Sequence, residues 1–222
     1  MNEKLLFFDI ETHRVKNWSD LSPALRKAFE AHVYNDNEKN IYANVEQCFN
    51  EKAALHAEFS QVICVSLGYE YENGFRVLSF SGRDEVKILT ELSETLDNFK
   101  NKWYSLAGHN INGFDKPYLA KRYIINKMQV PKILNSMGLK PWEISDVDTM
   151  QVWKFGSWSA TSLEVISAAL GIQCKSTEIS GSNMYKYDIE NMNWAELKMY
   201  CEEDVKSCYQ IYKRIFYKEN AF

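Results

Sequence analysis

Two carboxylates near the N-terminus, Asp9 and Glu11, are the first residues of the chain whose types and spacing suggest chemistry. They follow the apolar run 5–8 in the segment KLLFFDIET. Because side chains alternate along a strand, Asp9 and Glu11 should project to one side at the end of a buried strand over 4–8, with Cα atoms roughly 6.5 Å apart. Such a pair can bind a divalent cation, although acidic residues are also common where a strand simply emerges into water.

A third carboxylate lies in the apolar face of a predicted C-terminal helix over about 194–217. Asp204 occupies a position of this face where the three-to-four spacing calls for a core residue. A buried carboxylate is normally neutralised, paired with a base or bound to a metal, because burial of an unpaired charge is costly. Tyr200 lies one turn earlier and shares the face of Asp204. The apolar members of the face are Leu197, Cys201, Cys208, Ile211 and Ile215.

The fourth carboxylate, Asp115, stands in the loop GHNINGFD, two residues before Pro117. An isolated Asp-x-Pro is more typical of a helix cap. This loop, however, leaves a probable central strand, and ligands are often bound at the carboxyl ends of strands. Four clustered carboxylates would repel one another unless cations lie between them. Hard oxygen ligands suit Mg²⁺ or Mn²⁺, and two such ions would complement this set.

The elements that must position these residues alternate between strands and helices. Strands are predicted over 4–8, 61–71, 75–82 and 103–108, and the Asn-Gly pair at 73–74 indicates an antiparallel hairpin. Helices are predicted over 83–101, 117–128, 150–155, 163–170 and 194–217. This order favours an α/β fold with a mixed central sheet flanked by helices. We predict a single domain over 1–222, with a helical insertion at about 14–59.

Composition limits the function classes. The formal net charge of −4 repels a phosphate backbone, so that any contact with nucleic acid must be local. The five cysteines form no CxxC pair and the four histidines no HxxxH pair, which argues against a zinc site or a disulfide framework. No apolar run is long enough for a signal peptide or a membrane span, and we therefore expect a cytoplasmic protein without membrane contact.

Three segments carry a resemblance to a known family. FFDIET, GHNINGFDKPYL and YCEEDV resemble the three motifs of the DEDD superfamily of 3'-5' exonucleases, in the subtype whose third motif is Tyr-x-x-x-Asp. Within it, the chain is most similar to predicted exonucleases related to the proofreading domain of family B DNA polymerases. FSQVICVSLGY, DVDTMQVWKF and SLEVISAALGI also resemble that group. The resemblance implies a ribonuclease H-like fold and a two-metal site held by Asp9, Glu11, Asp115 and Asp204.

The resemblance also implies an activity. We expect a two-metal-dependent exonuclease, using Mg²⁺ or Mn²⁺, that releases nucleoside 5'-monophosphates from the 3' end of single-stranded nucleic acid, DNA rather than RNA. In such a site one ion lowers the pKa of a bound water and the other stabilises the departing 3' oxygen. Tyr200 is expected to orient the attacking water, because a phenol with a pKa of about 10 is mostly protonated at neutral pH.

Weaker predictions concern substrate contacts. His109 could contact a nucleotide or form a hydrogen bond within its loop. Phe114 could pack against a base or fill the core. Asp148 is interpreted as a helix N-cap outside the metal set. Six basic residues form either a local basic track for a single nucleic-acid strand or a solvated helix face. They are Lys116, Lys121, Arg122, Lys127, Lys175 and Lys186. The residues predicted to contact the terminal nucleotide are Ile10, Thr12, His109, Asn110 and Phe114.

Three other functions fit the same residues. An RNA-trimming enzyme similar to oligoribonuclease differs only in the space left for the ribose 2'-hydroxyl. A non-catalytic nucleic-acid-binding module would keep the fold without turnover. A structural calcium site would use the same acids without hydrolysis.

Overall fold

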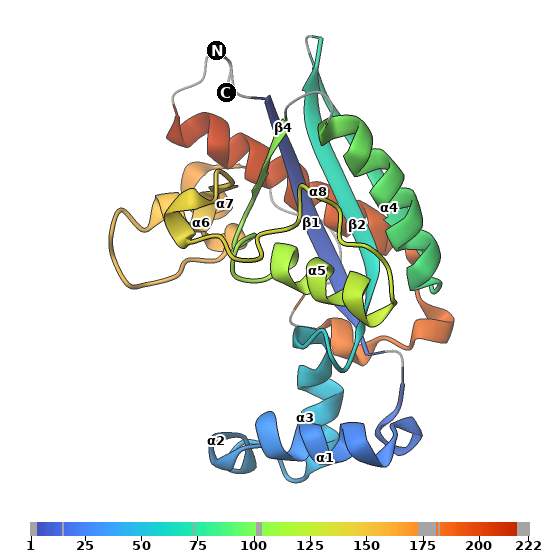
Figure 1. Cartoon of the computed structure of the whole chain (residues 1–222). Helices are drawn as coiled ribbons and strands as arrows, with labels where there is room; N and C mark the ends of the chain where they lie inside the picture. The colour runs from blue at the N-terminus through green and yellow to red at the C-terminus, as the bar shows by residue number, and fades with distance from the viewer. Residues whose placement is uncertain are drawn as a thin grey trace.

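The computed structural model of the chain describes residues 4–14, 16–72, 74–100, 104–172, 181 and 183–216 (Figure 1). Within these residues five strands form one sheet in the order β3-β2-β1-β4-β5. Pairing is antiparallel for β1–β2 and β2–β3 and parallel for β1–β4 and β4–β5, so that the sheet is mixed, as predicted. The strands are β1 (Lys4–His13), β2 (Gln61–Tyr71), β3 (Gly74–Ser81), β4 (Tyr104–Gly108) and β5 (Val147–Asp148).

Helices cover both faces of this sheet (Figure 1). On one face, α4 (Glu85–Lys100) and α5 (Asp115–Ile125) pack on Leu6, Phe8 and Ile10 of β1. On the other face, α8 (Trp194–Ile215) contributes Val205 and Cys208 to a core with Leu5 and Phe7. Because side chains alternate along β1, Asp9 and Glu11 face the α8 side. The α/β fold with a mixed sheet flanked by helices is therefore confirmed.

The strand that carries the two acids is longer than predicted. β1 continues past Phe8 to His13 and stays paired with β2, with a register shift between Glu11 and Thr12. On its other side, pairing with β4 stops at Phe7, because β4 ends at Gly108. The prediction that Asp9 and Glu11 stand at the end of the strand was therefore wrong. Asp9 and Glu11 stand inside β1, beyond the point at which β4 has ended.

The helices differ from the prediction mainly at their ends. α7 (Leu163–Leu170) has the predicted bounds, with Ser162 as N-cap and Gly171 in the left-handed region as C-cap. α5 begins at Asp115 rather than at Pro117, and α6 spans Thr149–Trp153. The predicted turn residue Asn73 and the predicted boundaries at Asn101, Trp103 and Tyr217 lie outside the described residues. Within the described part of the chain, no helix combines the length and apolar character needed to span a membrane.

Short helices connect β1 to β2. They are η1 (Trp18–Asp20), α1 (Pro23–His32), α2 (Asp36–Lys39), α3 (Val45–Lys52) and η2 (Ala53–Leu55). They lie beyond the end of β1 and enclose a small core of their own that includes Leu21, Phe29 and Phe49 (Figure 1). The hydroxyl of Thr12 donates to the Ala54 carbonyl at 2.7 Å, which ties this segment to β1. Three further short helices are η3 (Pro141–Glu143), η4 (Met184–Lys186) and η5 (Ile189–Asn191).

Arg122 does not belong to a basic track on the surface. It is buried, its Nε donates to Glu85 Oε1 at 2.8 Å, and its Nη1 donates to the Ala57 carbonyl at 2.6 Å. The same Glu85 oxygen accepts from the Val62 backbone at 2.8 Å. This ion pair therefore joins α5, α4, β2 and the segment that precedes β2.

Replacing Arg122 by alanine should lower the free energy of unfolding by about 3–5 kcal/mol, because the Glu85 carboxylate would stay buried without its cation. Lys121→Ala is the matched control. Lys121 pairs with Glu58 at the surface, where both side chains are about half exposed, and such a pair contributes about 1 kcal/mol at most. Urea unfolding measures both values. Equal stabilities for the two variants would contradict the structural role of Arg122.

Candidate functional site

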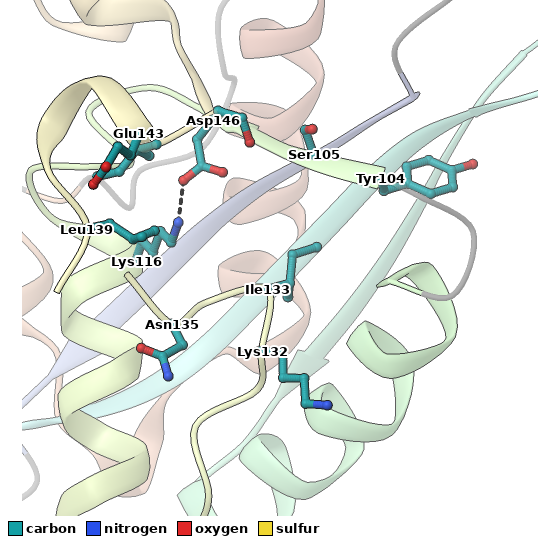
Figure 2. Close-up of a pocket in the computed structure, with 11 residues that line it drawn as sticks. Tyr104, Ser105, Lys116, Lys132, Ile133, Asn135, Leu139, Glu143 and Asp146 are labelled. Atoms are coloured by element: carbon teal, nitrogen blue, oxygen red, sulfur yellow. Dashed lines mark hydrogen bonds and ion pairs between the residues drawn. The ribbon is translucent and has the colours of Figure 1, made fainter. Parts of the chain in front are cut away.

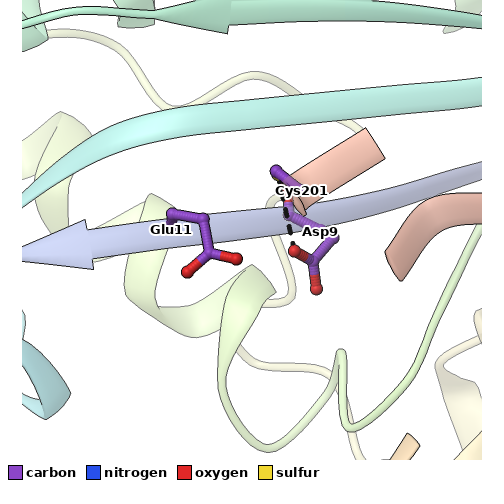
Figure 3. Close-up of side chains that lie close together, drawn as sticks. All are labelled: Asp9, Glu11 and Cys201. Carbon is purple, nitrogen blue, oxygen red and sulfur yellow. Dashed lines mark hydrogen bonds between the residues drawn. The ribbon is translucent and has the colours of Figure 1, made fainter. Parts of the chain in front are cut away.

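Asp9 and Glu11 project from the same side of β1, and Cys201 of α8 lies beside Asp9 (Figure 3). Three atoms lie within 4.8 Å of one another: one carboxylate oxygen of Asp9, one of Glu11 and the Cys201 sulfur. Glu11 is buried and Asp9 is half-buried. The predicted convergence of these two carboxylates is therefore present in the structure.

Asp115 approaches the same strand from the first turn of α5. Its Oδ1 accepts a hydrogen bond from the Ile10 backbone at 3.1 Å, at a point of β1 that β4 no longer reaches. Burial, with added repulsion from Asp148 and Asp204, raises the pKa of Asp115 to about 7. The alternative role as helix cap is not observed, because the N-cap of α5 is Phe114 and no side chain caps it.

Tyr200 and Asp204 complete the group from α8, one turn apart on the same face. The Tyr200 hydroxyl accepts a hydrogen bond from the Gly181 backbone at 3.0 Å. Burial, and then repulsion by the charges of Glu11 and Asp204, raise the pKa of Tyr200 well above its usual range. The phenol is therefore protonated at neutral pH. The charge of Asp204 acts on both Asp115 and Tyr200, so that the predicted acids of β1, α5 and α8 lie near one another. Of these four acids, only Asp9 and Glu11 belong to the described group whose ligand atoms lie within 4.8 Å of one another.

Cys201 is a member of this group that the sequence did not indicate. Its thiol donates to Asp9, to Oδ2 at 3.4 Å and to the carbonyl at 3.5 Å (Figure 3). Burial and the neighbouring Cys64 raise the pKa of the Cys201 thiol well above its usual value. It therefore holds Asp9 as a protonated donor. In the sequence, a cysteine of an apolar stripe cannot be told from an ordinary core residue.

His109 connects two separate segments through both of its ring nitrogens. Nδ1 lies 3.0 Å from the Thr149 hydroxyl and Nε2 lies 3.0 Å from the Thr161 carbonyl. Burial lowers the pKa of this imidazole. The arrangement supports the alternative of a hydrogen bond within the loops, and contact with a nucleotide stays a prediction.

Asp148 organises the loop that leads to Asp115. Its Oδ1 accepts from the Met150 backbone at 3.0 Å, which confirms the predicted N-cap of α6. The same oxygen accepts from the Asn110 backbone at 3.0 Å, a contact that the sequence did not reveal. Asn110 has a left-handed φ of 61°, and a Cβ at Gly113 would come within 2.4 Å of its Oδ1. A glycine at 113 therefore makes room for the Asn110 side chain.

The other predicted substrate contacts lie close to the acids but are largely covered. Ile10 and Thr12 are buried, and the Thr12 hydroxyl is engaged with Ala54. Phe114 is half-buried and packs on Tyr118, with ring centroids 5.1 Å apart. Much of these side chains serves packing, and their contact with a nucleotide stays a prediction.

Lys116 is not part of a basic track either. It forms a buried ion pair with Asp146 at a cavity of about 500 Å³ between β4 and the segment 132–146 (Figure 2). Lys121 pairs with Glu58, and Lys127 and Lys186 are exposed. Lys175 lies outside the described residues. The predicted track is therefore broken at Lys116 and at Arg122, where each cation has a buried carboxylate as partner.

The chain is similar to known proteins in sequence and in fold. Residues 52–222 match a family described as predicted 3'-5' exonucleases related to the exonuclease domain of PolB. The matched part holds Asp115, Tyr200 and Asp204, whereas β1 precedes it. No curated protein sequence matches the chain.

The fold is similar to that of a solved polymerase. The family B DNA polymerase from the hyperthermophilic archaeon Pyrobaculum calidifontis superposes with a TM-score of 0.64 at 17% sequence identity. The similarity covers 97% of this chain and 25% of the polymerase chain, so that the chain spans a quarter of the polymerase's length. At this identity the likeness shows a shared fold, which is ribonuclease H-like.

Proposed function

The chain belongs to the family of predicted 3'-5' exonucleases related to the exonuclease domain of PolB, and we propose that it hydrolyses single-stranded nucleic acid from the 3' end in a metal-dependent reaction. We propose DNA rather than RNA as the substrate and nucleoside 5'-monophosphates as the products. The observation that carries this proposal is the pair Asp9 and Glu11, whose ligand atoms lie within 4.8 Å of each other, with Asp115 of α5 and Asp204 of α8 near them.

The donor chemistry of this group fits Mg²⁺ or Mn²⁺. Its four acids supply hard oxygen ligands. Burial is the main cause of the raised pKa of Asp115, and the charges of Asp148 and Asp204 add to it, so that negative charge lies close to Asp115. We propose all four acids as the metal ligands. When bound, two such ions would lower the pKa of a water and stabilise the departing 3' oxygen. The protonated Cys201 would add no thiolate ligand.

The residues of the chain contribute position and hydrogen bonds. The sheet fixes Asp9 and Glu11, since β1 is paired with β2 from Leu6 through Glu11. The Cys201 thiol holds the Asp9 carboxylate. Tyr200 acts as a neutral phenol that orients the attacking water, because burial and the nearby carboxylates raise its pKa and favour the protonated form.

Replacing Tyr200 by phenylalanine should lower kcat by about 10- to 100-fold, less than the loss of a full general base, with little change in KM. Only the hydroxyl is removed, so that the fold should persist. Tyr209→Phe is the matched control, because the Tyr209 hydroxyl binds Glu70 at 2.7 Å at the far end of the same helix. Steady-state hydrolysis of a labelled oligomer measures both. An unchanged kcat in Tyr200→Phe would contradict the orienting role.

The proposal is tested by digestion of a 5'-labelled single-stranded DNA oligomer with Mn²⁺, Mg²⁺, Ca²⁺ or chelator. We expect a ladder that shortens from the 3' end with Mn²⁺ and Mg²⁺ only, since Ca²⁺ prefers a looser geometry. A matched RNA oligomer tests the oligoribonuclease-like alternative. Tight binding with an intact oligomer in every condition would instead favour a non-catalytic binding module.

A further inference from the structure

Two aromatic side chains project into solvent between α6 and α7. Trp158 is 100% exposed and Phe155 is 85% exposed. They belong to residues 154–158, which we call the aromatic turn. The Ser157 backbone donates to the Lys154 carbonyl at 2.8 Å, which closes a turn with Phe155 and Gly156 at its centre. Neither aromatic ring therefore stabilises the fold by burial.

The backbone of this turn is unfavourable for the residue that it carries. Phe155 has a φ of 45° and Gly156 a φ of 82°. Turns with two central residues of positive φ favour glycine, asparagine and aspartate, and a bulky residue in that region is an outlier. Because the Phe155 ring is exposed, packing does not offset this cost. Backbone strain that no packing within the fold offsets points to contact with another molecule.

The segment that carries the aromatic turn is tied on both sides to His109, next to the loop that leads to Asp115. The two ring nitrogens of His109 hold Thr149, before the turn, and Thr161, after it, each at 3.0 Å. The residue after His109 begins the loop that leads to Asp115, and Asp148 joins that loop to α6. One set of hydrogen bonds therefore positions both the aromatic turn and one of the proposed metal ligands.

The chemistry around the turn favours a nucleic-acid strand over a protein partner. Lys154 is the only charged residue of the segment 149–162, although the chain as a whole is acidic. The exposed neighbours Ser157 and Ser159 are small and polar, so that the two rings do not extend into a continuous apolar patch of the kind that binds proteins. Exposed aromatic rings beside a cation are suited to unpaired bases and their phosphates.

We propose that Lys154, Phe155 and Trp158 form a stacking surface for unpaired bases of the strand whose 3' end enters the carboxylate site. The role as a substrate surface rests on the proposed nuclease function. The surface would bind bases without regard to sequence, because every base offers a flat face. It would therefore set the affinity for long substrates and leave the chemistry at the terminal nucleotide unchanged.

The test compares the wild type with the double variant Phe155→Ala/Trp158→Ala on two substrates. The p-nitrophenyl ester of thymidine 5'-monophosphate fills only the terminal position, and an oligothymidylate of about 12 nucleotides also reaches a separate stacking surface. With Mn²⁺ we expect equal hydrolysis of the ester but a KM for the oligomer raised by about tenfold or more. Fluorescence anisotropy in Ca²⁺ should show the same increase in Kd.

Two further variants serve as controls. Phe155→Tyr/Trp158→Tyr keeps two stacking rings and should restore the KM. Tyr71→Ala removes a partly exposed ring at the β2–β3 hairpin, near the N-terminal end of β1 and away from Asp9 and Glu11. It should leave the KM for the oligomer unchanged.

Each outcome bears on one of the two proposals. Equal KM and Kd in the wild type and the alanine double variant would overturn the stacking surface while leaving the nuclease function intact. Weaker binding by that variant, in a protein that hydrolyses neither substrate, would support the surface and contradict the nuclease. A changed oligomeric state in size-exclusion chromatography, with unchanged oligomer binding, would assign the aromatic turn to a protein contact and overturn the proposal.

Discussion

Replacing Asp204 by asparagine is expected to lower the rate of oligonucleotide hydrolysis by about a thousandfold while the protein stays folded. The amide has nearly the shape of the carboxylate but no charge, and is a much weaker ligand for Mg²⁺ or Mn²⁺. The fold should persist because the charge of Asp204 acts against its neighbours, raising the pKa of both Asp115 and Tyr200. In chelator, the variant should therefore still unfold cooperatively, at a temperature close to that of the wild type.

Glu203→Gln is the matched control for this prediction. Glu203 precedes Asp204 on α8 but pairs with Lys206 at 3.7 Å on the solvent side. It should retain wild-type turnover with Mn²⁺. Hydrolysis by Asp204→Asn at the rate of this control would remove α8 from the proposed metal site. A lower unfolding temperature in chelator would show instead that Asp204 stabilises the fold, and the loss of activity would then need another explanation.

Local patterns predicted the acids, and tertiary contacts determine how they meet. Strand alternation placed Asp9 and Glu11 on one side, and the interrupted apolar stripe singled out Asp204. The position of Asp9 and Glu11 within β1 was not predicted, because β1 continues to His13 through its pairing with β2, while β4 on its other side has already ended. The length of one strand is not encoded in the residues of its neighbour. A sequence pattern therefore predicts which residues lie close together better than it predicts where in the sheet they lie.

The two buried cations also show that local sequence patterns do not predict tertiary contacts. Arg122 and Lys116 lie in a helix with other basic residues, and a surface track was a reasonable interpretation of that spacing. Their partners, Glu85 and Asp146, are 37 and 30 residues away in the chain. No local pattern indicates such a pair. Asp148 illustrates the contrast, since its role as the α6 N-cap depends on the next few residues and was predicted, whereas its bond to Asn110 was not.

Two substitutions of Asp115 should separate its contribution to the fold from its contribution to the reaction. Asp115→Asn and Asp115→Ala should each lower hydrolysis by about a thousandfold, because both remove a proposed metal ligand. Only the alanine variant should also lose stability, by about 1–3 kcal/mol, because the buried Ile10 N–H would lose its acceptor. Asparagine keeps an oxygen at the position of the present 3.1 Å hydrogen bond.

A neutral side chain at 115 suits the metal-free fold, since burial already raises the pKa of Asp115 to about 7 and so favours its uncharged form. Urea unfolding in chelator measures the two stabilities, and hydrolysis with Mn²⁺ measures the two activities. Equal stabilities would show that the contact with Ile10 contributes little to the fold. Full activity in the asparagine variant would show that the oxygen at 115 acts through that hydrogen bond, positioning β1, and that the negative charge needed for a metal comes from Asp9, Glu11 and Asp204.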